Sequence, residues 1–301
     1  MESYFQKRKL APSTVKAYMI RLRKLNDNKP VTTIDFLSDY ESMFKKISHL
    51  ANNTQRGYLI TIMQALKSTN KYDDEKDVYE AKLEELEYIR EEQQDNYRKS
   101  EKEKERWCSL LELKAVGDYW LDLINEEFEN NIVHNGTKVF NIYKMALISL
   151  LYTEQPPIRL EYATMSVIDN ESDITKGNNY LLRENGKYIV ILQEFKTKKS
   201  QGKKRIPITS GKLTNLLDDY LKLNTSGYLF PTAHYSTHMT PNAFGKLIPK
   251  AFESIGKKIT LNIIRHIFIS EHIDYTVLDE HASLASAMCH NVNTQKTYVK
   301  V

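Results

Sequence analysis

The stretch YIVILQEFKTKKSQGKKRIPI, residues 188–208, decides the fold class of the second half of the chain. Tyr188–Phe195 and Arg205–Ile208 are rich in β-branched and aromatic residues, as strands usually are. Between them lies a basic run, Lys196–Arg205, which contains no acidic residue, and Gly202 within it is a typical turn residue. The pattern predicts a β-hairpin with lysines at its tip.

Helical patterns surround this hairpin on both sides. Apolar residues recur at spacings of three and four over Leu110–Phe128 and Val139–Tyr152 before it, and over Leu213–Leu223, Thr240–Ser254 and Thr260–Ile273 after it. A last helix pair is expected from about residue 276 to residue 298, and a further short strand at Tyr180–Leu182. We therefore expect residues 107–301 to form a mostly helical domain with a small inserted β-sheet.

Residues 1–72 are expected to form a separate helical bundle. Pro12 gives a first-turn signal, and Val15, Tyr18, Leu22 and Leu25 then follow at helical spacing. Two more helices are expected over residues 34–52 and 54–67.

A charged segment, residues 73–106, joins these two parts. About two-thirds of it is charged, it contains neither Gly nor Pro, and its apolar stripe is limited to Tyr79, Leu83, Leu86 and Ile89. The pattern predicts a solvated helical connector with a break near residues 95–100, in a mainly α protein.

Composition limits the class of protein. The chain has 301 residues, of which 41% are hydrophobic and 27% charged, which is typical of folded domains. It has no apolar run of about 20 residues to span a bilayer, and its first residues lack the pattern of a secretory signal. Its two cysteines, Cys108 and Cys289, suit a reducing compartment. We expect an intracellular protein of the cytoplasm or the nucleus of a host cell, with no membrane partner.

Positive charge is concentrated in two regions although the net charge is only +4. Residues 1–75 carry five more basic than acidic side chains, whereas residues 76–106 have a net charge of −3. With the basic hairpin, this distribution suits a polyanion that meets two basic surfaces, and solvated loops are the plainer alternative. The candidate DNA-binding residues are Lys16, Arg21, Arg23, Lys24, Arg56, Lys198, Lys199, Lys203, Lys204 and Arg205.

Three short segments carry side chains that suit chemistry on a phosphate. PPIRLEYATMSVID, residues 156–169, places Arg159 after a double proline, and TLNIIRHIFISEH, residues 260–272, places Arg265 in an apolar helix. MCHNVNTQKTYVKV, residues 288–301, places His290 eight residues before Tyr298. Each residue alone has an ordinary structural explanation, such as an arginine that caps a helix. Their order, with a lysine hairpin between the two arginines, is harder to explain by chance.

In this order the sequence resembles the tyrosine recombinases, phage-integrase-like enzymes that break and rejoin DNA. Residues 10–26, LAPSTVKAYMIRLRKLN, resemble the first helix of the family's core-binding domain, and residues 107–301 resemble its catalytic domain. The double proline, together with the departures from the family pattern given below, is more similar to divergent members from large DNA viruses and mobile elements. The catalytic residues that the resemblance implies are Arg159, Lys196 (with Lys198 as the fallback), Arg265, His290 and Tyr298.

The resemblance implies the integrase fold and a site-specific recombinase that integrates or excises a mobile or viral element. Such an enzyme acts on double-stranded DNA through a 3′-phosphotyrosine intermediate, as a dimer or tetramer of one chain, with neither a cofactor nor a metal. A type IB topoisomerase uses the same groups, so DNA relaxation is an alternative. A DNA-binding protein that has lost catalysis is a second alternative, and a helical scaffold for proteins is a third.

The sequence departs from the family pattern in three places. Asn262 occupies the position of a common His or Lys and donates hydrogen bonds but transfers no proton near neutral pH. Tyr162 stands where the family has an acid, and Glu161 lies one place early. The step from His290 to Tyr298 is one residue shorter than usual. We regard Asn262, Glu161 and His266, which directly follows Arg265, as candidate supporting residues.

Phosphoryl transfer explains why these residue types suit the proposed site. Two guanidinium groups grip the phosphate oxygens with paired donors and stay charged at any relevant pH. A lysine supplies a proton to the departing 5′ oxygen, and a histidine assists the attacking phenol. No metal is expected, because His234 and His238 lie in a Pro-flanked loop without the Glu of zinc helices.

Overall fold

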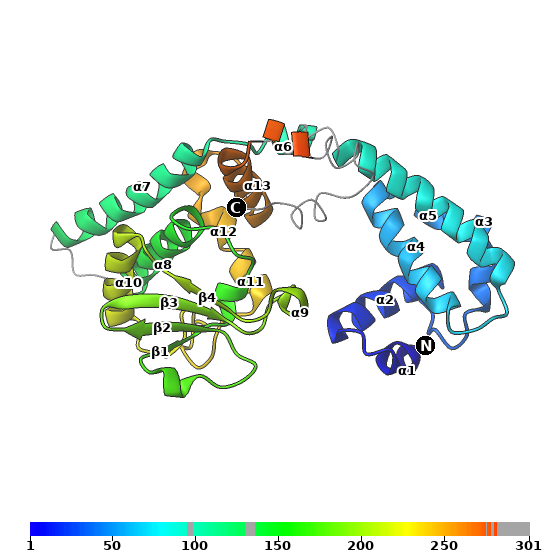
Figure 1. Cartoon of the computed structure of the whole chain (residues 1–301), viewed down its shortest axis with the longest axis horizontal. Coiled ribbons are helices and arrows are strands. Elements are labelled where there is room, and N and C mark those ends of the chain that lie inside the picture. The colour runs from blue at the N-terminus through cyan, green and yellow to red at the C-terminus, as the bar shows by residue number, and fades with distance from the viewer. Residues whose placement is uncertain (95–98, 130–135, 275, 278–279, 282–301) are drawn as a thin grey trace. The chain divides into compact units, whose positions relative to one another are not determined.

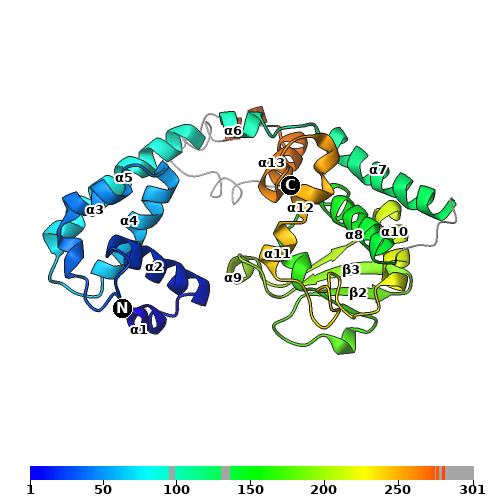
Figure 2. The same ribbon diagram turned by 180° about the vertical axis from the view of Figure 1, so that it is seen from behind.

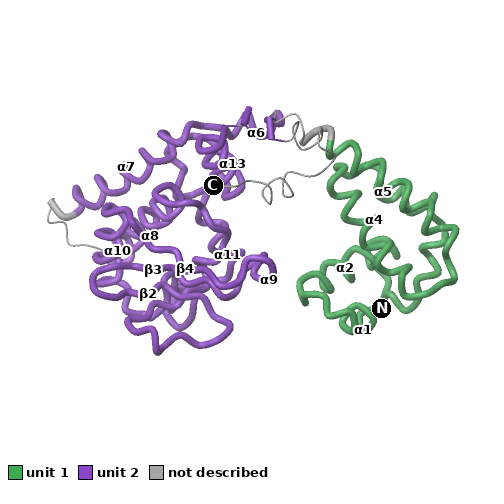
Figure 3. The backbone as a smooth tube through the Cα atoms, viewed as in Figure 1, with its two compact units in different colours: residues 1–98 green, residues 99–301 purple. Residues whose placement is uncertain are grey.

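The structure is a computed structural model, and it describes the whole chain apart from residues 95–98, 130–135, 275, 278–279 and 282–301. The chain divides into two compact units, Met1–Arg98 and Lys99–Val301 (Figure 3). Each unit has a hydrophobic core of its own. The described residues are mainly helical, with one small mixed sheet in the second unit.

In the described residues of the first unit, the regular elements are all helices, joined by short loops. Its elements are α1 (Glu2–Lys7), α2 (Pro12–Leu25), a 3-10 turn (Asp35–Ser38), α3 (Tyr40–Ile47), α4 (Asn52–Leu66) and α5 (Asp73–Gln94). The Asp39 carboxylate accepts a hydrogen bond from the Ser42 N–H at 3.0 Å and so caps α3. The helix expected over residues 34–52 is therefore shorter, because the chain first makes a 3-10 turn and begins the helix after this cap.

Helix α5 packs on the core of the first unit, so residues 73–94 of the expected connector are part of that unit. The Tyr79 ring is fully buried, and its hydroxyl donates a hydrogen bond to the Leu37 carbonyl at 2.7 Å. Leu86 is also buried, and Leu83 and Ile89 pack against the same core, so α5 lies along α4. A stripe of only four apolar residues is enough, because it meets a preformed apolar surface.

The second unit surrounds a small sheet with helices. Its helices are α6 (Glu101–Lys104), α7 (Leu110–Glu129), α8 (Gly136–Thr153), α9 (Lys198–Gln201), α10 (Gly211–Leu223), α11 (Pro241–Gly245), α12 (Ile248–Ala251) and α13 (Leu261–His272). Single 3-10 turns cover Glu161–Thr164, Glu171–Asp173 and Glu253–Ile255. Helix α8 packs against α7, α10 and α12, and the first two lie beside it in both views (Figures 1 and 2).

The sheet has the order β1 (Ser166–Ile168), β2 (Tyr180–Glu184), β3 (Lys187–Leu192) and β4 (Lys204–Pro207). Strands β1 and β2 are parallel, and the other two pairs are antiparallel. Asn185 and Gly186, both with positive φ, make the tight turn between β2 and β3. The hairpin predicted over residues 188–208 is confirmed as β3 and β4, with α9 between them and Gly202 at a φ of 65°.

Two of the predicted helical segments lie in the last third of the chain. The helix expected over Thr240–Ser254 is broken into α11, α12 and a 3-10 turn. Pro249 explains the break, since it lacks an N–H and its ring clashes with the preceding turn. The helix pair expected over residues 276–298 lies for the most part outside the described residues. Within the described part of the chain, no helix is both long and apolar enough to cross a bilayer.

Candidate functional site

A cavity of about 410 Å³ lies where several distant segments of the second unit meet. Arg159 and Glu161 border it before and within the first 3-10 turn of this unit. Asn179, just before β2, Glu194, just after β3, and Asn262, on α13, also border it. The other lining residues are Leu160, Thr164, Pro241 and Leu261. Two of the predicted catalytic segments, the one with Arg159 and the one with Arg265, therefore contribute to one cavity.

Arg159 is held through its main chain, and its side chain is exposed. Pro156 and Pro157 follow α8 and end it, since neither donates an N–H to continue the helix. The buried Tyr152 hydroxyl donates a hydrogen bond to the Arg159 carbonyl at 2.7 Å. Arg159 precedes the 3-10 turn Glu161–Thr164. The guanidinium thus projects from a main chain that is tied to the core.

Arg265 lies close to this anchor point. It is half-buried on α13, one turn beyond Asn262 and on the same face, and it borders a second cavity of about 260 Å³ with Pro156 and Pro157. Burial raises the pKa of Tyr152 well above its ordinary value, and the positive charge of Arg265 acts in the opposite direction. The phenol that binds the Arg159 carbonyl therefore also lies in the field of Arg265.

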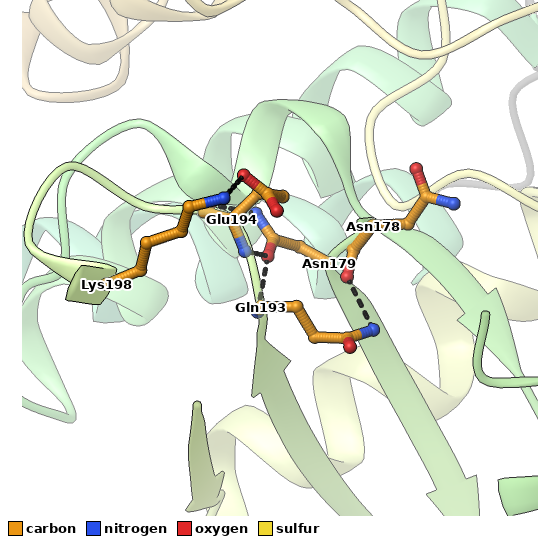
Figure 4. Close-up of polar contacts among 5 residues, drawn as sticks. All are labelled: Asn178, Asn179, Gln193, Glu194 and Lys198. Atoms are coloured by element: carbon orange, nitrogen blue, oxygen red, sulfur yellow. Dashed lines mark hydrogen bonds and ion pairs between the residues drawn. The ribbon is translucent and has the colours of Figure 1, made fainter. Parts of the chain in front are cut away.

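The stem of the basic arm, which we define as residues 193–203 between β3 and β4, forms another wall of the cavity. The Asn179 carboxamide oxygen accepts hydrogen bonds from the N–H groups of Gln193 at 2.9 Å and Glu194 at 2.8 Å, and its nitrogen donates to the Glu194 carbonyl at 2.8 Å (Figure 4). The Gln193 side chain donates to the carbonyls of Thr175 and Asn178 at 2.7 and 3.1 Å. These contacts fix the stem directly before Lys196.

The two candidate arm lysines differ in their surroundings. Lys196 is exposed, and among the described residues it has no hydrogen bond or ion pair. Lys198 forms an ion pair with Glu194 (Figure 4). Lys198 would therefore have to leave an ion pair in order to reach a ligand, whereas Lys196 has none with the described residues.

The candidate supporting residues are not equivalent in the structure. Glu161 borders the cavity, and its Oε2 atom is buried without a hydrogen-bond partner. Tyr162 is buried and accepts a hydrogen bond from the Gln155 side chain, so it is part of the core. His266 lies 3.9 Å from the Glu103 carboxylate and is not among the lining residues of the cavity. This position differs from the expected support of Arg265.

Several candidate DNA-binding residues already have partners within their own unit. The Arg21 guanidinium packs against Gly57 and donates to the Thr61 hydroxyl at 3.3 Å, and Arg56 is 3.1 Å from Glu87. Arg205 pairs with Glu171. The candidates that are exposed and form no ion pair with another described residue are Lys16, Arg23, Lys24, Lys199, Lys203 and Lys204. A polyanion would meet these lysines and arginine first.

The remaining predicted residues lie beyond what the structure describes. His290 and Tyr298 fall outside the described residues. Within the described ranges, no group of three or more His, Cys, Asp or Glu side chains is arranged to hold a metal ion. His234 and His238 are among the described residues and form no such group. Sequence reasoning missed Asn179 and Tyr152, for which a single Asn before a strand and one of 19 tyrosines gave no signal. No protein-family profile matches the chain, and no curated protein matches it significantly.

Proposed function

We propose that this protein is a site-specific DNA recombinase of the tyrosine recombinase type, with the integrase fold in its second unit. It would cleave and rejoin double-stranded DNA in order to integrate or excise a mobile or viral element. The observation that carries the proposal is the convergence of three distant segments. Arg159 and Asn262 border one cavity with the stem of the basic arm, and Arg265 lies one helical turn beyond Asn262.

The chemistry follows from the charges of these groups. Arg159 and Arg265 hold the non-bridging oxygens of the scissile phosphate and stabilise the extra charge of the transition state. The Tyr298 phenol attacks phosphorus with help from His290, and Lys196 protonates the departing 5′ oxygen. The phosphotyrosine bond conserves the energy of the original linkage, so that resealing needs no nucleotide.

Exposed cations of both units support a grip on the DNA backbone. Lys16, Arg23 and Lys24 are exposed on α2 of the first unit, and Lys199 and Lys203 are exposed on the basic arm. Such contacts recognise phosphates without regard to sequence and weaken as salt rises. In this proposal two or four copies assemble on DNA, since recombination exchanges strands between two sites.

A nicked suicide duplex tests the proposal. A short fragment downstream of the cleavage site diffuses away after attack, so that the covalent complex accumulates and migrates as a heavier band on a denaturing gel. We expect an adduct with the unaltered protein and none with Tyr298→Phe, which should still bind DNA. Mapping the attached residue completes the test. Tight binding by the unaltered protein without an adduct would instead favour a DNA-binding protein without catalysis.

A further inference from the structure

We propose that Asn179 is a positioning residue for Lys196, whose ammonium group it places by fixing the stem of the basic arm. This inference rests on the proposed function of the site. In this proposal the buried Asn179 amide touches neither the phosphate nor the nucleophile. It affects one step of the reaction, the protonation of the leaving oxygen.

All the polar contacts of the Asn179 side chain go to the stem. The residue is 4% exposed, and its three hydrogen bonds, of 2.8–2.9 Å, join the main chain of Gln193 and Glu194. Both ends of the carboxamide are therefore satisfied in a buried setting, where hydrogen bonds hold geometry most firmly. A side chain that only filled space would not need this polarity.

The three hydrogen bonds of the Asn179 carboxamide to Gln193 and Glu194, which we call the clamp, lie where the regular sheet ends. The antiparallel pairing of β2 with β3 begins at the Tyr180–Ile191 pair, and the pairing of β3 with β4 ends at Leu192 and Lys204. Past that point the Asn179 carboxamide takes the place of a neighbouring strand for the next two residues.

The clamp also fixes the root of Lys196 relative to the cavity. Phe195, the residue between the clamp and the lysine, packs its side chain against the core. Asn179 and Glu194 border the same cavity as Arg159. The lysine thus starts from a point tied to the wall that carries the first arginine, while its side chain extends into solvent.

The step that Asn179 affects can be isolated chemically. In the proposed cleavage the Tyr298 oxygen bonds to phosphorus, the bond from phosphorus to the 5′ oxygen breaks, and Lys196 gives that oxygen a proton. The phenol proton passes to His290. A displacement of about 1 Å in such a group costs on the order of 10²-fold in rate. If sulfur replaces the 5′ bridging oxygen, the proton is not needed, because a thiol has a pKa of about 8.5 and leaves as its anion.

The experiment compares adduct formation on suicide duplexes with oxygen or sulfur at the bridging position. We expect Asn179→Ala to be slower than the unaltered protein by about 10²-fold on the oxygen substrate, since it loses the proton donor's placement. On the sulfur substrate we expect Asn179→Ala to form the adduct as fast as the unaltered protein. Lys196→Ala should likewise be slow on the oxygen substrate and as fast as the unaltered protein on the sulfur substrate. Arg159→Ala should be slow on both substrates. Asn178→Ala is the matched control, because it removes only the exposed amide next to the clamp and keeps the carbonyl that Gln193 uses.

A second variant separates positioning from folding. Asn179→Asp keeps the acceptor for both N–H groups but places a carboxylate oxygen, which repels the Glu194 carbonyl, where the donor was. We therefore expect a slowing on the oxygen substrate that sulfur also reverses. Equal rates of Asn179→Ala and the unaltered protein on oxygen, or slowing by both Asn179 variants that persists on sulfur, would overturn the inference alone. Failure of the unaltered protein to form an adduct on either substrate would overturn the proposed function, and the inference with it.

Discussion

Replacement of Arg159 by alanine should separate catalysis from folding and from DNA binding. The side chain is exposed and the main-chain carbonyl keeps its bond from Tyr152, so the free energy of unfolding should change by less than about 0.5 kcal/mol. Loss of donors to the transition-state oxygens costs about 2.7–4 kcal/mol, which corresponds to about 10²–10³-fold in cleavage rate. Arg159→Lys should recover little of this loss, because an ammonium cannot make the paired contact of a guanidinium.

Single-turnover adduct formation and fluorescence anisotropy on the same duplex measure the two effects. Arg159 supplies one phosphate contact among many, which contributes about 0.9 to the slope of log affinity against log salt. Its loss should therefore weaken DNA binding far less than it slows cleavage. Arg183→Ala is the matched control, since that arginine belongs to the same unit, pairs with Asp169 at 2.7 Å and is not a candidate DNA-binding residue. If Arg159→Ala cleaved at the unaltered rate, or lost cleavage only in proportion to affinity, its assignment to the transition state would be refuted.

Three further predictions concern the two units. Tyr79→Ala should lower the free energy of unfolding of the first unit by about 3–5 kcal/mol, measured by hydrogen exchange of α4 and α5. Glu84→Ala, at an exposed residue on the same helix, is the control and should change it by no more than about 0.5 kcal/mol. Neutralising three exposed lysines together, two on the basic arm and one at the start of β4, should reduce the salt slope of DNA binding by about 2.7. An unchanged slope would exclude them from the interface. The variant is Lys199→Gln, Lys203→Gln and Lys204→Gln. Hydrogen bonds from the Tyr72 hydroxyl and the Lys71 ammonium lower the pKa of Asp35 to about 2. Because this is below the unfolded value near 3.8, the stabilisation is complete above about pH 4 and is lost as pH falls through 2. Asp35→Asn should therefore show a shallower fall in Tm between pH 5 and pH 2, and curves that fall in parallel would contradict the assignment.

Long periodic segments were predictable because their pattern is local. Leu110–Phe128 and Thr260–Ile273 repeat apolar residues over several turns, and the structure has α7 and α13 there. The hairpin over residues 188–208 followed from two strand-like runs and a turn glycine. The cavity was predictable only in part, through Arg159, Glu161 and Asn262.

The features that sequence reasoning missed depend on neighbours that are distant in the chain. The charge of α5 suggested a connector, whereas Tyr79 is buried because the rest of the first unit offers it a core. Arg21 and Arg56 carry the charge of a DNA contact but pack on other helices of their unit. Asn179 has no periodic signature, since its role comes from the main chain of residues 14 and 15 positions later.

The setting of α8 has a consequence for changes in chain length. Its residues from Ala146 to Thr153 are all buried, so its last turn has no room to rotate or slide. A residue inserted between Thr153 and Arg159 would therefore have to bulge outward and carry the guanidinium with it. The stretch from Lys198 to Lys203 is exposed, so an extra residue there would enter solvent at little cost. Among related chains, insertions and deletions should accumulate between Lys198 and Lys203 and be nearly absent between Thr153 and Arg159.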